Sequence, residues 1–212
     1  MMLYLIRHGR SRANEAGLVT GTPADVLSEE GLAQGARMAA WLAETGIVAD
    51  RHVVSQWNRA SQTADLLIPH ARWEVDARLG ETNAGEVADW KLERFVAAEP
   101  HFYDHPANRY PGGESHLELN ERVLGWLHER LEERCERLMV VAHSGPISCV
   151  LQQVLGIGMH RFPAFLPAHA SLSVVDVRLH DGEPEGRLLG FSLGPASNLP
   201  APIRGTSSQV AS

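Results

Sequence analysis

The sequence predicts a three-layer α/β/α protein with a mainly parallel central sheet. Short apolar runs alternate with helical segments that carry apolar residues on one side, and this alternation is typical of parallel strands joined by helices. The length of 212 residues and a hydrophobic content of 44% suit one domain with a sizeable insertion. The alternation breaks down near residues 83–116, so we expect a small cap insertion there.

The first half of the chain repeats a strand and helix pattern. A buried strand is predicted over residues 2–6, and Ser28 is placed to cap a helix that runs through Thr45. Residues 53–55 form a second short strand, and a helix starts at Asn58. Trp73 and Val75 indicate a further strand. The order predicts successive parallel strands with helical crossovers.

The second half continues the pattern after the insertion. A long helix is predicted over residues 114–135, and a buried strand over 138–142. A helix over residues 146–155 follows, with proline in its permissive first turn. Residues 172–177 and 188–193 are predicted to form two closing strands. We expect residues 1–193 to form a single domain. The proline-, glycine- and serine-rich residues 194–212 suit a flexible C-terminal tail.

Charge and cysteine content narrow the classes of function. The formal net charge of −7 argues against partners such as nucleic acid or a membrane surface, so a small molecule is the expected partner. Cys135 and Cys149 lack metal-ligand or disulfide spacing, and both are expected to be core thiols. The apolar run before Arg7 is too short for a signal peptide, which favours a cytoplasmic enzyme.

Two histidines follow strands that are far apart in the sequence. His8 ends the first predicted strand within Arg7-His8-Gly9, and His143 ends the strand over residues 138–142. Carboxyl ends of parallel strands share one edge of the sheet, where open α/β folds bind ligands. Arg59 lies one helical turn beyond the strand that ends at Ser55. Two imidazoles and two guanidinium groups at one edge predict a phosphate site.

Four ordered blocks carry a family resemblance. They begin at Arg7, Ser55, Pro111 and Val140, and they read RHGRSRAN, SQWNRASQTA, PGGES and VVAHSG. In these blocks the sequence resembles the histidine phosphatase superfamily, also called phosphoglycerate mutase-like, and the match extends to about residue 155. The resemblance implies catalysis through a phosphohistidine, without a metal ion or cofactor.

The resemblance also implies a role for individual residues. His8 is then the nucleophile, with Arg7, Arg59 and His143 around the phosphate. Glu81, which follows Arg78-Leu79-Gly80, is then the proton donor. The family motif that comes next is degraded here, so Glu86 is the alternative proton donor. Further phosphate-binding candidates complete the site: Ser11, Asn14, Gly21 and Ser144. For Ser11 and Asn14, capping of a helix is an equally good interpretation.

We therefore expect a phosphomonoesterase that acts on a small organic monophosphate. The alternatives within the family are a phosphoglycerate-type mutase and a catalytically degenerate module that binds a phosphorylated ligand. A homodimer is left open. The insertion disfavours polyanionic substrates, because residues 83–116 hold three Lys or Arg against six Asp or Glu.

The sequence is less typical of two other kinds of site, a serine hydrolase and a metal centre. A serine hydrolase would use Ser144 on a strand-to-helix turn, but residues 142–146 lack the glycines of a nucleophile elbow. His101, His105 and His116 cluster in the insertion without the regular spacing of metal ligands. The insertion also holds five aromatic residues that either pack the cap or line a pocket for a ring: Trp90, Phe95, Phe102, Tyr103 and Tyr110.

Overall fold

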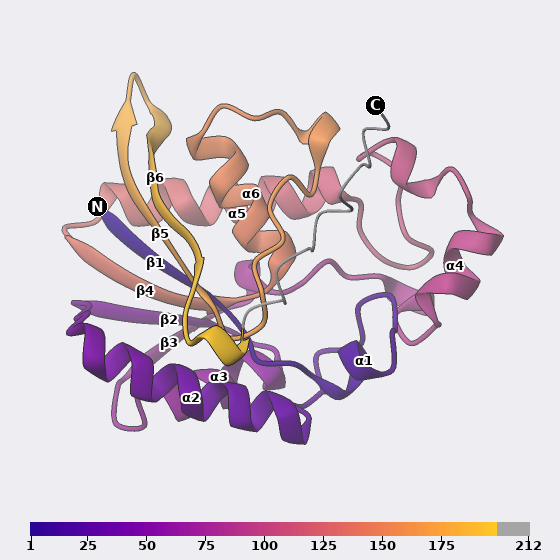
Figure 1. Cartoon of the computed structure of the whole chain (residues 1–212). Helices are drawn as coiled ribbons and strands as arrows, with labels where there is room; N and C mark the ends of the chain where they lie inside the picture. The colour runs from indigo at the N-terminus through magenta and orange to yellow at the C-terminus, as the bar shows by residue number, and fades with distance from the viewer. Residues whose placement is uncertain (199–212) are drawn as a thin grey trace, which may run out of the picture.

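A six-stranded sheet runs through the centre of the computed structural model, which describes residues 1–198 (Figure 1). The strand order is β3-β2-β4-β1-β5-β6. The first four are parallel neighbours, whereas β5 pairs antiparallel with both β1 and β6. The strands are β1 (Met2–Arg7), β2 (Arg51–Ser55), β3 (Trp73–Asp76), β4 (Arg137–Ala142), β5 (Leu172–His180) and β6 (Glu183–Leu193). The predicted three-layer, mainly parallel fold is confirmed.

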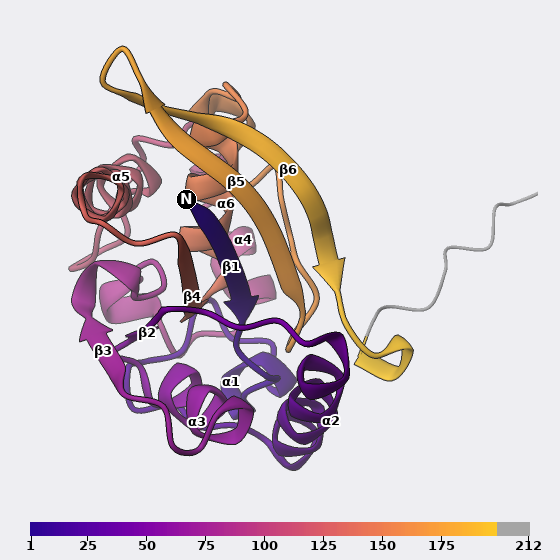
Figure 2. The same cartoon turned by 90° about the vertical axis from the view of Figure 1, so that its left-hand side faces the viewer.

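Helices cover both faces of the sheet, as Figures 1 and 2 show. One pair is α2 (Glu29–Thr45) and α3 (Asn58–Leu67), and the other is α5 (His116–Glu132) and α6 (Ser144–Val154). Side chains of β4 alternate between the two faces: Val140 packs with α5 and α6, whereas Val141 packs with α2 and α3. This period of two divides the apolar core into two layers.

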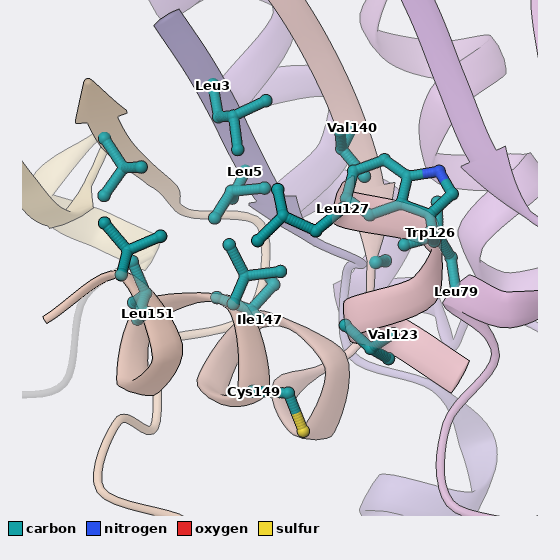
Figure 3. Close-up of a cluster of buried hydrophobic side chains, with 14 of the residues drawn as sticks. Leu3, Leu5, Leu79, Val123, Trp126, Leu127, Val140, Ile147, Cys149 and Leu151 are labelled. Carbon is teal, nitrogen blue, oxygen red and sulfur yellow. The ribbon is translucent and has the colours of Figure 1, made fainter. Parts of the chain in front are cut away.

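The core beneath α5 and α6 joins distant parts of the chain (Figure 3). Leu3 and Leu5 of β1 meet Trp126 of α5 and Ile147 of α6, and all four are almost fully buried. Burial of apolar side chains of this size contributes about 1.5–3 kcal/mol each relative to exposure. Cys149 is buried in this cluster as predicted, whereas Cys135 is only partly buried against it.

Several predicted helix starts are confirmed by their caps. The Ser28 hydroxyl accepts a hydrogen bond from the Gly31 amide at the start of α2. Ser115 and Glu118 form a reciprocal capping box at the start of α5, so this helix begins at His116 rather than at residue 114. The proline of α6 lies in its first turn, as expected.

The insertion is more ordered than the sequence predicts. It contains the helix α4 (Leu92–Ala98) and two 3-10 turns, at Gly85–Val87 and Phe102–Asp104. Phe95 and Phe102 are buried in a small cluster of their own, with Trp90 packed against it. In Figure 1 the cap lies beyond the carboxyl end of β1, next to the short helix α1 (Arg12–Glu15).

The predicted tail starts as folded chain. Ala196–Asn198 forms a 3-10 turn, and the buried Asn198 donates from Nδ2 to the carbonyl oxygens of Gln34 and Ala170. The rest of the predicted tail, residues 199–212, lies outside the described residues. Within residues 1–198, no helix has the length and apolar character needed to cross a bilayer.

A close backbone contact holds the loop after His8 against α2. A Cβ at Gly31 would lie 1.9 Å from the carbonyl oxygen of Arg10, and a Cβ at Gly9 would lie 2.6 Å from that of Gly31. Both obstacles are backbone atoms that cannot rotate away. The sequence around the histidine therefore requires glycine on both sides of this contact.

We expect Gly31→Ala to lower the free energy of unfolding by about 2 kcal/mol, since the added methyl group forces the backbone apart. Gly125→Ala is the matched control: Gly125 is an exposed residue within α5, with no heavy atom within 4 Å of its added Cβ. This second change should raise stability by about 0.5–1 kcal/mol through helix propensity. Urea unfolding of both variants measures the difference, and equal stability would contradict the contact.

Candidate active site

The carboxyl edge of the sheet brings the two predicted histidines together. Arg7, the last residue of β1, is in register with Ala142, the last residue of β4, so His8 and His143 follow at the same level. Their ring centroids are 4.9 Å apart and the rings meet edge to face. Both side chains are buried.

The hydrogen bonds of His8 define which ring nitrogen carries the proton. Nδ1 lies 2.6 Å from the carbonyl oxygen of Gly9, which can only accept, so Nδ1 is the donor. Nε2 accepts from Nε of Arg59 at 3.1 Å. His8 is therefore a neutral imidazole whose Nε2 lone pair faces a cation.

The surroundings of His8 keep it neutral. Burial lowers its pKa well below the usual 6.5, and the nearby charges of Arg59, His143, Arg7 and His169 lower it further, in that order. The ring thus remains unprotonated as the pH falls through 6.5. An unprotonated imidazole is the form that can attack an electrophile.

Arg59, at the start of α3, is held from several directions. Its NH1 pairs with Asp25 at 3.2 Å and its NH2 donates to the carbonyl oxygen of Thr20 at 3.2 Å. The guanidinium carbon lies 4.4 Å from the ring centroid of Trp57. Burial lowers the pKa of Arg59, while Glu81 and Asp25 oppose that shift. Asp25 lies in a loop, and no sequence pattern indicated its role.

Arg7 offers a second cation beside His8. NH1 donates to the carbonyl oxygen of Pro167 at 2.7 Å, which anchors the side chain. Its Nε is buried and has no hydrogen-bond partner among residues 1–198. Burial is the main cause that lowers the pKa of Arg7 to about 10, so the group stays charged at neutral pH.

The second histidine, His143, also has an unpaired ring nitrogen. Its Nδ1 is buried without a partner in the described part of the chain, while its Nε2 lies 2.8 Å from Oγ of Ser55.

Asn14 is oriented by three donors. Its Oδ1 lies 3.1 Å from the Ser11 amide, 3.0 Å from Oγ of Ser11 and 3.0 Å from Nε2 of His169. Because the oxygen accepts these bonds, Nδ2 is left to donate, and no acceptor in the described chain takes it. Burial is the main cause that lowers the pKa of His169 to about 3, so a neutral ring with its proton on Nε2 fits this contact.

Glu81 lies opposite the start of α6. Its Oε2 accepts from Oγ of Ser144 at 3.2 Å and from the Gly145 amide at 3.4 Å, and its Oε1 accepts from the Thr82 amide at 3.0 Å. These contacts fix the carboxyl group near the helix N-terminus. The structure thus places the proposed acid, Glu81, at the predicted sheet edge.

Arg122 of α5 secures the loop that carries Glu81. Its guanidinium donates to the carbonyl oxygens of Arg78, Gly80 and Glu81 at 2.6–3.0 Å, and it pairs with Glu114 at 2.6 Å. Three hydrogen bonds to backbone carbonyls hold the loop against α5, and two more to Glu114 orient the same planar group. The PGGES block supplies Glu114, but its partner Arg122 was not predicted.

The lining residues of one cavity, about 410 Å³ in volume, include most of these groups. Arg7, His8, Asn14, Arg59 and Glu81 all line it. Ser144 and Gly145 join them from the start of α6. His143 packs behind His8 instead of forming part of the cavity wall.

Besides His143, three further sequence-based candidates do not line the cavity. Glu86 packs next to Gly112, so it does not share the cavity with Glu81. The amide of Gly21 donates to the carbonyl oxygen of Ala88, which leaves no backbone donor there for a phosphate. Ser11 is buried as the N-cap of α1 and forms a capping box with Asn14, so its capping interpretation is the one that the geometry supports.

Residues 1–198 do not form the geometry of a serine hydrolase site or of a metal site. The Ser144 hydroxyl donates to the Glu81 carboxyl group and is not paired with a histidine. His101 is exposed beside Asp104, and Nδ1 of His105 accepts from the Ala107 amide. Among residues 1–198, no three His, Cys, Asp or Glu side chains are grouped as metal ligands.

The fold and this cavity define an α/β protein with paired histidines and arginines at the carboxyl edge of its sheet. The sequence model of the histidine phosphatase superfamily (branch 1) matches residues 3–189. The chain belongs to this superfamily, as the motifs predict. Its relatives include rat 6-phosphofructo-2-kinase/fructose-2,6-bisphosphatase 4, which is 30% identical over 182 residues. That match covers 82% of this chain but only 37% of the relative.

A second relative spans nearly the same length. The probable phosphoglycerate mutase GpmB of Escherichia fergusonii is 26% identical over 95% of this chain and 96% of its own. Among solved structures, a mycobacterial glucosyl-3-phosphoglycerate phosphatase has a TM-score of 0.79 and 24% identity, over 90% of this chain and 98% of its own. A putative alpha-ribazole-5'-P phosphatase from Escherichia coli has a TM-score of 0.77 and 23% identity, over 92% and 98% of the two chains. These structures share the fold.

Proposed function

We propose that the protein is a metal-independent phosphomonoesterase that works through a phosphohistidine on His8. The observation that carries this proposal is the state of His8: a neutral imidazole with its Nε2 lone pair facing the cavity cations. Phosphoryl transfer mainly requires positioning and positive charge around the equatorial oxygens. Arg7 and Arg59 provide that charge.

In the first step, Nε2 of His8 attacks the phosphorus atom and the ester P–O bond breaks. Glu81, in its acid form, gives its proton to the departing alkoxide oxygen. Phosphoryl oxygens replace His8 as the acceptor for Arg59 and take up the unpaired Nε of Arg7. The free Nδ2 of Asn14 and the start of α6 supply further donors.

In the second step, Glu81 as a carboxylate takes a proton from water while the water oxygen attacks phosphorus. The P–N bond breaks, inorganic phosphate leaves and His8 is neutral again. Hydrolysis is favoured over a mutase reaction because Arg7 and Arg59 are the only cations that line the cavity within the described chain. A mutase that acts on phosphoglycerate also needs a partner for the carboxylate.

Hydrolysis of p-nitrophenyl phosphate tests this function. The purified protein should release inorganic phosphate at the same rate before and after treatment with EDTA, because arginines supply the positive charge. The assay follows p-nitrophenolate and phosphate together. Activity that disappears with EDTA and returns only with a divalent ion would contradict the mechanism, and phosphate binding without any turnover would favour the degenerate module.

A further inference from the structure

The cap turns apolar side chains toward the phosphate-binding groups. Leu92 and Val96 of α4 line the cavity together with Tyr103 and Tyr110 of the insertion. Val19 and Leu166 extend this lining from two other loops. We call these six residues the apolar wall.

Part of the apolar wall is exposed to solvent. Leu166 is 65% exposed, and Leu92 and Val96 are each 41% exposed. Clustered exposed apolar side chains at a cavity are typical of a binding site that a ligand covers. The hydroxyl groups of Tyr103 and Tyr110 lie 3.2 Å apart and bond to each other, so one of their two O–H donors is already used within the wall.

The cations of the insertion are directed elsewhere. Lys91 donates to the carbonyl oxygen of Ala16, and Arg109 pairs with Glu118. The guanidinium carbon of Arg94 lies 3.6 Å from the ring centroid of Trp90. None of the three lines the cavity. A second phosphate or a carboxylate on the substrate would therefore have no cationic partner on the cap.

We propose that the physiological substrate is the phosphomonoester of an apolar, uncharged alcohol, whose alcohol group contacts the apolar wall. This substrate class rests on the proposed phosphatase function. The relatives whose names specify charged or sugar phosphates are similar in sequence or fold, but the cap residues of this chain favour a different alcohol.

The first test compares substrates whose leaving groups are primary alkoxides of similar basicity, so that chemistry does not mask binding. Benzyl phosphate should be hydrolysed with a kcat/KM at least about 10-fold higher than glycerol 3-phosphate or 3-phosphoglycerate, given the usual effect of a few buried methylene groups. Equal values, or a preference for 3-phosphoglycerate, would overturn the assigned class.

The second test changes the polarity of the wall with little change in shape. The double variant Val96→Thr/Leu166→Asn should lower kcat/KM for benzyl phosphate by about 10-fold and leave that for glycerol 3-phosphate within about 2-fold. Val75→Thr/Leu189→Asn is the matched control, because Val75 and Leu189 are 61% and 57% exposed and lie outside this cavity. The control should retain both activities. Equal losses on both substrates in the wall variant would overturn the proposal.

The two proposals fail in different ways. A protein that hydrolyses none of these esters, nor p-nitrophenyl phosphate, contradicts the phosphatase function itself. A protein that hydrolyses them all but does not favour benzyl phosphate retains that function and loses the substrate class. Circular dichroism of the parent protein and of the wall variant distinguishes these outcomes from loss of folding.

Discussion

His8→Ala is expected to lower kcat on p-nitrophenyl phosphate by at least about 10³-fold, because the variant lacks the nitrogen that receives the phosphoryl group. Arg7, Arg59 and Asn14 remain, so inorganic phosphate should still bind. Steady-state kinetics measures the first effect and isothermal titration measures the second.

Acid-labile, alkali-stable labelling from a ³²P-phosphoester gives an independent measure of the same step. The parent protein should carry label on histidine, and the His8→Ala variant should carry none. His101→Ala is the matched control, since that imidazole is exposed and bonds to Asp104, away from the cavity. Substantial turnover by His8→Ala, or label that persists in it, would rule out His8 as the nucleophile.

Glu81→Gln should produce the second large effect, and its size should depend on the leaving group. Hydrolysis of benzyl phosphate should fall by about 10²–10⁴-fold, the usual contribution of general acid catalysis. p-Nitrophenolate leaves without a proton, so its release should fall much less. The glutamine oxygen can still accept from the Ser144 hydroxyl and the Gly145 amide, which share Oε2 of Glu81, while its NH2 group loses the bond from the Thr82 amide.

Glu86→Gln is the control for the assignment of the acid. Glu86 packs beside Gly112 and does not line the cavity, so its variant should retain full activity on both esters. Equal losses on benzyl and p-nitrophenyl phosphate in Glu81→Gln would show that Glu81 does not protonate the leaving group. A larger loss in Glu86→Gln would transfer that role to Glu86.

The parallel sheet and the proximity of His8 to His143 were predictable from the sequence for one physical reason. Parallel strands end at a common edge, so His8, His143 and Arg59 could be placed together without knowledge of any loop. Helix α2 was predictable from Ser28 and the apolar positions that follow it. These features depend on local patterns that the fold does not override.

Other features depend on contacts between distant loops. Asp25 and His169 reach Arg59 and Asn14 through chain segments whose paths no periodic pattern specifies. Helix α4 was missed because it has seven residues and no side-chain hydrogen bond at its N-cap. The start of β6 was missed because Pro184 and Gly186 argue against a strand, yet β6 is an edge strand, where proline is tolerated.

The register that sets Arg7 beside Ala142 also bears on how the molecule folds. The pairing of β1 with β4 closes a loop that contains most of the chain. This closure costs conformational entropy before native contacts can lower the free energy of the chain. The cavity therefore exists only when this long-range pairing is complete. During refolding, recovery of catalysis should therefore report that this long-range pairing has formed.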